Sequence, residues 1–333
     1  MHGINFGGWF SQCDNSQERY DTFLSKEDFK TVHEWGLDHV RIPVDYELVQ
    51  NPDGSFKEDG FERLEQCITY CKEYGLNMIL DLHKTIGYSF DDGEAEEGFF
   101  NNEKYQQYFY DLWAQFAGRF GKYELVAFEL LNEVTAKEYC EKWNQIALKA
   151  ISIIREYAPV SKILLGGYYN NSVSAVKDLP VVADENIVYN FHCYDPLIFT
   201  HQGAYWISRM DPAFRMPFEA PQSEYLKKAA EQIGWYYNEG IKDTDEKISR
   251  QYFADIFAEA IEVAKQRNVA LYCGEYGVID LADPHDSLKW LECIGSIFEE
   301  YGIGRALWTY KEMDFGLIGQ HYDEVRSEYI RLL

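Results

Sequence analysis

The sequence has little positive charge. Its 333 residues include 31 Lys and Arg against 56 Asp and Glu, a formal net charge of −25. A negative field of this size repels nucleic acid and anionic membranes, and no basic cluster offsets it. We therefore expect neither partner and instead a neutral or cationic ligand, although the same charge could serve solubility alone.

Paired cysteines are also lacking. The seven cysteines are an odd number, and none has the close CxxC spacing of a zinc or redox site. Buried, reduced thiols in a reducing compartment account for them best. The first residues, MHGINFGGWF, lack a basic segment followed by a long apolar run, so no signal peptide is visible. We expect a cytoplasmic protein, or a secreted one if a leader has been trimmed.

Long hydrophobic runs, linkers and repeats are missing too. No window approaches the ~20 apolar residues that cross a membrane, and no Pro-, Ser- or Gly-rich stretch divides the chain. With 46% hydrophobic residues, the length suits one large core. An α/β barrel is commonly this long. We expect one catalytic domain over 1–333 and a monomer, although length alone also permits two domains.

Short apolar runs alternate with longer amphipathic segments, a pattern typical of βα units around a parallel sheet. The predicted strands are Ile4–Phe10, His39–Val44, Asn77–His83, Leu125–Glu133, Lys162–Gly167, Asn186–Pro196, Ala270–Val278 and Gly304–Lys311. This alternation predicts an α/β fold, a (β/α)8 TIM barrel. The rhythm breaks over residues 197–248, which we interpret as a subdomain or lid inserted after strand six. A doubly wound sheet is disfavoured because no GxGxxG motif follows any strand.

Polar residues gather at the ends of these predicted strands. Catalytic groups of a TIM barrel project from the C-terminal ends of its strands. The residues in question are Arg41, His83, Asn132, Glu133, His192, Tyr194, Glu275 and Trp308. Structural alternatives stay open for several of them: an internal ion pair for the arginine, satisfied core positions for the histidines and ordinary packing for the tryptophan.

Glu133 and Glu275 are the hardest of these residues to explain as structural. Each carboxylate follows an apolar run, where burial is costly unless the group is paired or used. Two carboxyl groups facing each other across a cleft suit glycosidic cleavage, in which one stays protonated and the other stays ionised. A neighbouring Arg41 would keep Glu275 ionised, and Tyr194 could donate a hydrogen bond to it. Asn132 is placed to bind a sugar hydroxyl.

Aromatic residues make up 17% of the chain and offer flat apolar faces for sugar rings. Besides Trp308, the candidates for further sugar subsites are Trp9, Tyr88 and Trp206. For each of these three, packing in the core or on the surface is an equally good explanation.

The ordered set of motifs resembles glycoside hydrolase family 5, the large retaining cellulase family. The matching pieces are GINFGGWF, HVRIPVD, LDLHK, FELLNEV, NFHCYDP, CGEYGV and ALWTYK. The likeness is greatest to compact single-module bacterial endoglucanases. It implies a TIM barrel that cleaves internal β-1,4 linkages of cellulose-type or mixed-linkage glucan, with no metal or cofactor. It also implies Glu275 as nucleophile and Glu133 as acid/base, with the other six strand-end residues in support.

The resemblance leaves some alternatives open. Where the family often has NEP, this chain has Val134 after Asn132 and Glu133. The same eight residues also serve exo-β-1,3-glucanases, β-glucosidases and β-mannanases. A catalytically silent glycan-binding barrel is the least favoured alternative, since both glutamates are present. An aldolase-like enzyme is disfavoured because no Schiff-base lysine or metal-ligand cluster stands at the strand ends.

Overall fold

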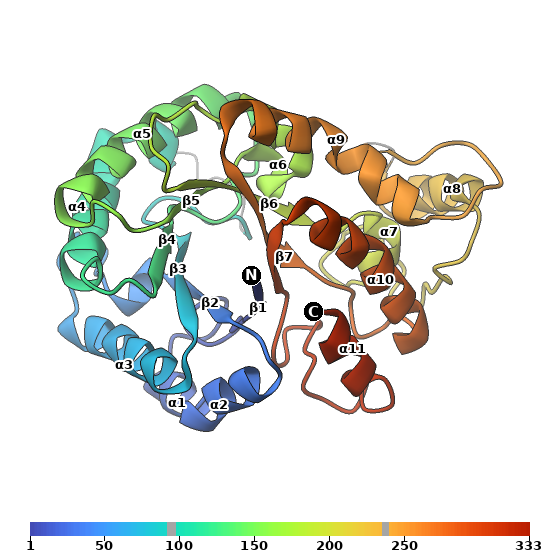
Figure 1. Cartoon of the computed structure of the whole chain (residues 1–333), viewed down its shortest axis with the longest axis horizontal. Coiled ribbons are helices and arrows are strands. Elements are labelled where there is room, and N and C mark those ends of the chain that lie inside the picture. The colour runs from blue at the N-terminus through green and yellow to red at the C-terminus, as the bar shows by residue number, and fades with distance from the viewer. Residues whose placement is uncertain (92–97, 235–239) are drawn as a thin grey trace.

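A computed structural model describes residues 1–91, 98–234 and 240–333. Within them, eight parallel strands close into a barrel in chain order (Figure 1). The strands are β1 His2–Asn5, β2 His39–Asp45, β3 Asn77–Lys84, β4 Val126–Glu129, β5 Ile163–Leu165, β6 Ile187–Cys193, β7 Ala270–Tyr276 and β8 Gly304–Leu307. The predicted (β/α)8 barrel is confirmed.

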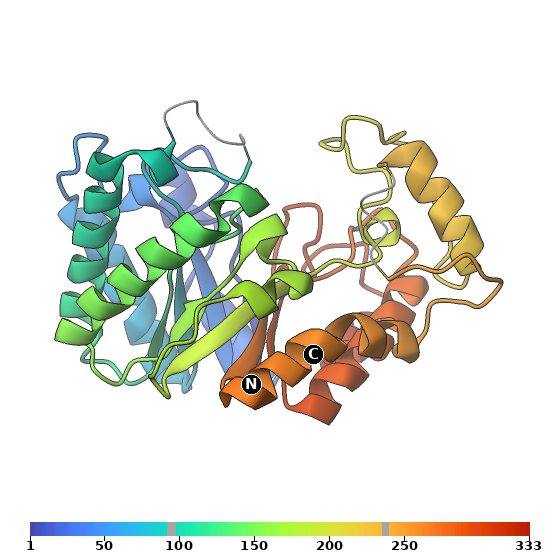
Figure 2. The same ribbon diagram turned by 90° about the horizontal axis from the view of Figure 1, so that it is seen from above.

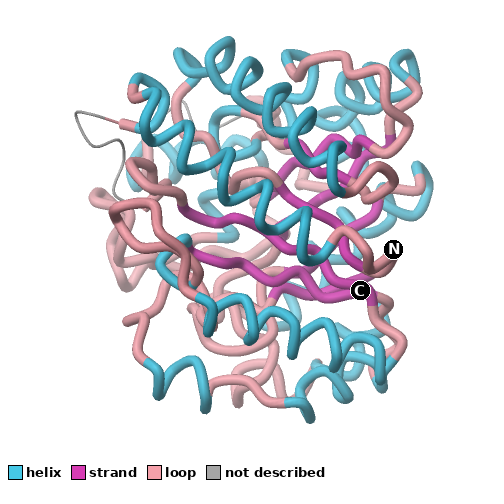
Figure 3. The backbone as a smooth tube through the Cα atoms, turned by 90° about the vertical axis from the view of Figure 1, so that its left-hand side faces the viewer, coloured by secondary structure: helices cyan, strands magenta, loops and turns pink. Residues whose placement is uncertain are grey.

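Helices surround the strands on the outside of the barrel (Figure 3). They are α1 Gln17–Thr22, α2 Lys26–Glu34, α3 Glu58–Tyr74, α4 Glu103–Phe120, α5 Cys140–Tyr157, α6 Tyr168–Asn171, α7 Leu197–Thr200, α8 Gln222–Gln232, α9 Arg250–Arg267, α10 Pro284–Tyr301 and α11 Arg326–Leu332. In the described residues, no helix is both long and apolar enough to cross a membrane.

The helix boundaries follow from capping residues. Gly75 ends α3 in the left-handed conformation, at φ 68°. The first residue of α10 is Pro284. Asp283 accepts hydrogen bonds from the first turn, and Pro284 suits the first helical position.

Several predicted strands were too long at their C-terminal ends. β4 stops at Glu129 rather than Glu133, and β8 stops at Leu307 rather than Lys311. The apolar residues beyond β4 are still buried, with Leu131 and Val134 each 1% exposed. They pack as loops above the barrel, so their hydrophobicity extends past the hydrogen-bonded ladder. Glu133 therefore lies on a loop just above its strand.

The barrel interior changes from apolar to charged along its axis. A small apolar cluster consists of Ile79, Leu164, Tyr272 and Ala306. The second group comprises Arg41, Glu129 and Asn190, which come from β2, β4 and β6 and contact one another across the barrel. Alternate strands commonly contribute the layers inside a TIM barrel. The polar residues at the C-terminal ends of the strands lie against this charged layer.

The segment between β6 and α9 leaves the barrel and carries α7 and α8. In Figure 2, α8 (yellow) lies to one side of the strands. The side chain of Asp286 on α10 accepts a hydrogen bond from Phe218 N at 3.0 Å, and Lys289 forms an ion pair with Glu219 at 2.7 Å. The start of α10 thus supports this segment. Residues 235–239 of the predicted insertion, and 92–97 of the loop after strand three, lie outside the described residues.

The burial of the cysteines predicts the reactivity of their thiols. In the part of the chain that the structure describes, which holds all seven cysteines, none forms a disulfide; Cys13, Cys140 and Cys293 are partly accessible and the other four are buried. Burial raises the pKa of the Cys67 and Cys273 thiols, which suppresses the reactive thiolate.

A colorimetric disulfide reagent at neutral pH should titrate at most three thiols rapidly in the folded protein. Seven should react in guanidinium without reductant, whereas a smaller total would reveal disulfides.

Candidate active site

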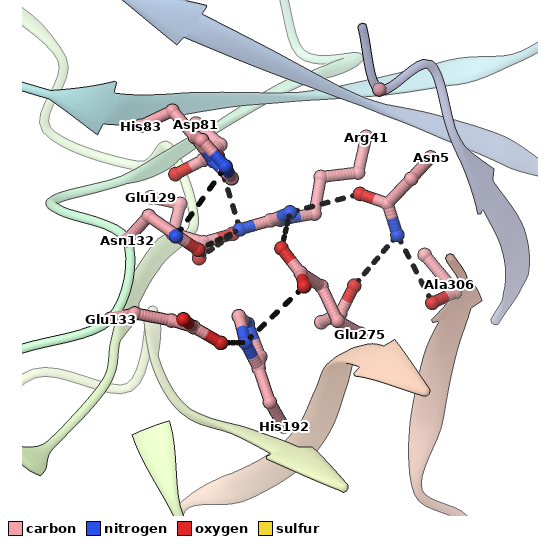
Figure 4. Close-up of polar contacts among 12 residues, drawn as sticks. Asn5, Arg41, Asp81, His83, Glu129, Asn132, Glu133, His192, Glu275 and Ala306 are labelled. Carbon is pink, nitrogen blue, oxygen red and sulfur yellow. Dashed lines mark hydrogen bonds and ion pairs between the residues drawn. The ribbon is translucent and has the colours of Figure 1, made fainter. Parts of the chain in front are cut away.

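Arg41 is the centre of the polar cluster at the C-terminal end of the barrel (Figure 4). It is fully buried, and its Nε and Nη2 donate in parallel to both oxygens of Glu129, at 2.7 and 2.8 Å. Its Nη1 donates to Glu275 Oε1 at 2.8 Å, and its Nη2 lies 3.0 Å from Asp81 Oδ2. One guanidinium thus joins three carboxylates from three strands, as only the planar fork of arginine can.

The sequence prediction missed several members of this cluster. Asp81 and Glu129 hold Arg41 from β3 and β4, and Asn5 accepts from its Nη1 at 2.9 Å. Asn190 donates to Glu129 Oε1 at 2.8 Å. Each is a polar residue within an otherwise apolar strand, the signal that singled out the strand-end residues. Asp81, Glu129 and Asn190 precede the predicted strand-end residues His83, Glu133 and His192 along the chain, so the strand-end rule does not find them.

Glu133 lies where a buried carboxyl group has two donors. Its Oε1 is 2.8 Å from Nδ1 of His192, and its Oε2 accepts from Asn170 Nδ2 at 2.9 Å. Burial raises the pKa of Glu133 to about 7, and the hydrogen bond from Asn170 opposes that rise. Burial also lowers the pKa of His192 to about 4, so the imidazole is neutral. The carboxyl group therefore retains a proton near neutral pH.

Glu275 faces Glu133 from the opposite side of the cleft. Besides the guanidinium of Arg41, it accepts a hydrogen bond from the Tyr194 hydroxyl at 2.9 Å. These contacts place a guanidinium and a hydroxyl donor against the Glu275 carboxyl group. One oxygen of each glutamate and one ring nitrogen of His192 lie within 4.8 Å of one another. The two carboxyl groups thus differ in their surroundings, one near neutral donors and one against a cation.

Three further predicted residues adjoin this cluster: His83, Asn132 and Trp308. His83 is bonded through Nδ1 to Asp81 at 2.6 Å, and burial lowers its pKa to about 3. Its ring is parallel to that of Trp308, with the ring centroids 5.9 Å apart. The Asn132 oxygen accepts from Arg41 at 2.9 Å. The structure therefore brings all eight predicted strand-end residues together.

The three peripheral aromatic candidates lie in different surroundings. Trp9 is 5% exposed, stacked on Phe10 with its indole N–H donated to Tyr20 O, so the structure does not bring it into the cleft. Tyr88 is buried; its hydroxyl donates to the carbonyl of Glu133 and accepts from Thr135 N, which fixes the loop after β4.

Trp206, by contrast, is 45% exposed. It lies against His201 and Phe315, and both of these rings contact Tyr194. Trp206 is therefore connected to Tyr194 through the rings of His201 and Phe315. Of the three peripheral candidates, only Trp206 has an open face that a sugar ring could reach.

Comparisons with known proteins agree with this geometry. The cellulase model of glycosyl hydrolase family 5 matches residues 5–314. Cellodextrinase A of Ruminococcus flavefaciens is 46% identical over 306 residues, covering 92% of this chain and 84% of that protein. Endoglucanase C of Acetivibrio thermocellus is 37% identical over 340 residues, covering 99% and 97%.

A solved structure of a hyperthermophilic endo-β-1,4-glucanase in complex with substrate is also similar. It is 25% identical with a TM-score of 0.76, covering 96% of this chain and 91% of that chain. The family model spans nearly the whole barrel, and two relatives exceed 30% identity over most of their length. This chain belongs to glycosyl hydrolase family 5.

Proposed function

We propose that this chain is a retaining hydrolase of β-1,4-linked glucans, with Glu275 as the nucleophile and Glu133 as the acid/base. The observation that carries the proposal is the approach of the two carboxyl groups, whose nearer oxygens lie within 4.8 Å. Retaining glycosidases hold their carboxyl groups about 5–5.5 Å apart, whereas inverting enzymes need about 6.5–9.5 Å to admit a water molecule.

The first step forms a covalent intermediate. An oxygen of Glu275 attacks the anomeric carbon while the bond to the leaving oxygen breaks and Glu133 gives that oxygen its proton. The guanidinium of Arg41 and the hydroxyl of Tyr194 donate to the carboxyl group of Glu275 and orient it for the attack. The donating group needs its proton, and burial keeps Glu133 protonated to about pH 7.

The second step reverses the roles. Glu133, now ionised, accepts a proton from water as the water oxygen attacks the anomeric carbon, and the bond to Glu275 breaks. Two inversions leave the product with the configuration of the substrate. His192 and Asn170 donate to the Glu133 carboxylate that exists between the steps. All the groups involved come from one chain, so we propose that the enzyme acts as a monomer.

The substrate follows from the relatives together with the site. The two relatives are named as a cellodextrinase and an endoglucanase, and the similar solved structure is named as an endo-β-1,4-glucanase. A neutral glucan suits a chain with a net charge of −25. The partly exposed Trp206 and the ring of Trp308 offer apolar faces to successive sugar units. Cellulose-type oligosaccharides and mixed-linkage glucan are therefore the proposed substrates.

Removing either glutamate tests the assigned roles. Glu275→Ala and Glu133→Ala should each lower kcat/KM on cellotetraose by roughly 10²–10⁴-fold or more. With an activated aryl β-cellobioside, azide should restore turnover in both variants. The glycosyl azide from Glu275→Ala should be inverted, because azide takes the place of the nucleophile, and that from Glu133→Ala should be retained. Glu62→Ala, on the exposed face of α3, is the control. Wild-type turnover in either active-site variant would mean that the wrong carboxylate is named.

The pH profile tests the protonated state of Glu133. Its raised pKa means that the neutral form is complete well below pH 7 and is lost as pH rises through about 7. We expect kcat/KM on cellotetraose to fall along a basic limb centred near pH 7. In Glu133→Ala, assayed with an activated aryl glycoside, that limb should be missing. A basic limb that survives in this variant would assign it to another group.

Product analysis separates the substrate alternatives. We expect short cello-oligosaccharides from barley mixed-linkage glucan and from carboxymethylcellulose, with rapid loss of viscosity, and little release from laminarin or glucomannan. Steady release of glucose without a drop in viscosity would indicate exo action instead. Preferential cleavage of glucomannan would indicate a mannanase. Faster turnover of cellotetraose than of either polymer would indicate cellodextrinase action.

A further inference from the structure

A short left-handed turn follows β5 and lies beside the acid/base. Tyr169, Asn170 and Asn171 have φ of 49°, 55° and 54° in succession. A run of three non-glycine residues in this region is rare, although asparagine tolerates it better than most. Backbone in such a conformation persists where the surrounding structure holds it, often at functional sites. What the turn contacts is therefore informative.

Both asparagines of the turn reach the acid/base or its partner. Asn170 Nδ2 donates to Glu133 Oε2 at 2.9 Å, and its backbone N–H donates to Val134 O at 3.0 Å. Asn171 is fully buried, and its Nδ2 lies 3.4 Å from Nε2 of His192. With its Nε2 toward that amide, the neutral His192 carries its proton on Nδ1 and donates to Glu133 Oε1.

These contacts leave Glu133 with one fixed donor on each oxygen. His192 serves Oε1, so Oε2 depends on Asn170, whose own side chain is otherwise open to solvent. Glu133 itself has φ of 38°, and Tyr88 holds its carbonyl. The backbone of Glu133 is thus held by Tyr88 from the loop after β3, and its side chain by Asn170 from the turn after β5. A buried carboxyl group held this way changes its proton affinity when one donor is removed.

We propose that Asn170 is a positioning residue that aims Glu133 and limits its proton affinity, so that one group can both donate and accept a proton during turnover. The inference rests on the proposed function, because it concerns the same acid/base. Asn170 stabilises the ionised form that must exist between the two steps. The left-handed turn is required because it brings a side-chain amide from the turn after β5 onto a carboxyl group from the loop after β4.

Other charged groups around Glu133 act in both directions and do not change in the test. They are Arg41 on β2, Asp81 on β3, Asp91 after β3, Glu129 on β4, His192 on β6, Tyr194 after β6 and Glu275 on β7. Arg41 lowers the pKa of Glu133, whereas Asp91 and Glu129 raise it. Because all of them are unaltered in a variant at residue 170, a displaced pH profile reports the loss of the amide donor.

Two substitutions suit the backbone at residue 170. Asn170→Gly removes the amide and accepts a φ of 55° without strain, which alanine would not. Asn170→Asp keeps the shape and tolerates the conformation, but it replaces the donor with a negative charge. Asn268→Gly is the matched control, since Asn268 has φ of 52° at the end of α9, before β7 and at the opposite end of the barrel.

The measurement is the pH dependence of kcat/KM and kcat on cellotetraose, with thermal unfolding to check folding. The basic limb should move up by roughly 0.5–1 pH unit in Asn170→Gly and further in Asn170→Asp. It should stay in place in Asn268→Gly. Above pH 7, the Asn170 variants should then lose less of their maximal activity than wild type.

Four results would overturn the inference. Unmoved limbs with a uniformly lower rate would make Asn170 merely structural. Unmoved limbs with a raised KM would make it a substrate contact. A wild type that is inactive on all four polysaccharides and on cellotetraose would remove the proposed function and this inference together. A normal wild-type profile with unmoved variants would remove this inference alone.

Discussion

The buried guanidinium of Arg41 is the interaction on which the site depends. It lies at the centre of the barrel and contacts carboxylates from β3, β4 and β7. Removing the cation from such a cluster would leave several buried negative charges without compensation, a change that typically destabilises a protein by about 3–5 kcal/mol. Arg41 thus offsets the repulsion among the three carboxylates that lie against it.

The single cation Arg41 also explains why Glu133 and Glu275 differ in their surroundings. Arg41 contacts Glu275 directly but reaches Glu133 only through its field. His83 and His192, the two histidines of the cluster, are neutral and add no positive charge, because burial lowers the pKa of both. Carboxyl groups near one another cannot all ionise at neutral pH in a buried site. Glu133 is bonded to the neutral donors His192 and Asn170, and burial raises its pKa to about 7.

The fold and the gathering of the strand-end residues could be predicted from the sequence to a large extent, and the limits have physical causes. The βα rhythm predicts eight strands because apolar runs and helix stops are local signals, and the strand-end residues stand out as polar positions after such runs. Strand ends were misplaced because loops over the barrel are as buried as strands, as at Leu131. Asn170 could not be foreseen, because a left-handed turn has no clear sequence signal when asparagine rather than glycine supplies it. Trp9 looked like a cleft residue and packs in the core.

The bond between Arg41 and Asn5 connects the second strand with the first, and the bond to Glu275 connects it with the seventh. Asn5 in turn donates to the carbonyl oxygens of Gly274 and Ala306, on β7 and β8. The catalytic cluster thus spans the seam where the two ends of the chain meet. A nascent or fragmentary polypeptide lacking β7 and β8 has neither Glu275, the proposed nucleophile, nor the closed barrel. Hydrolytic activity therefore depends on closure of the barrel.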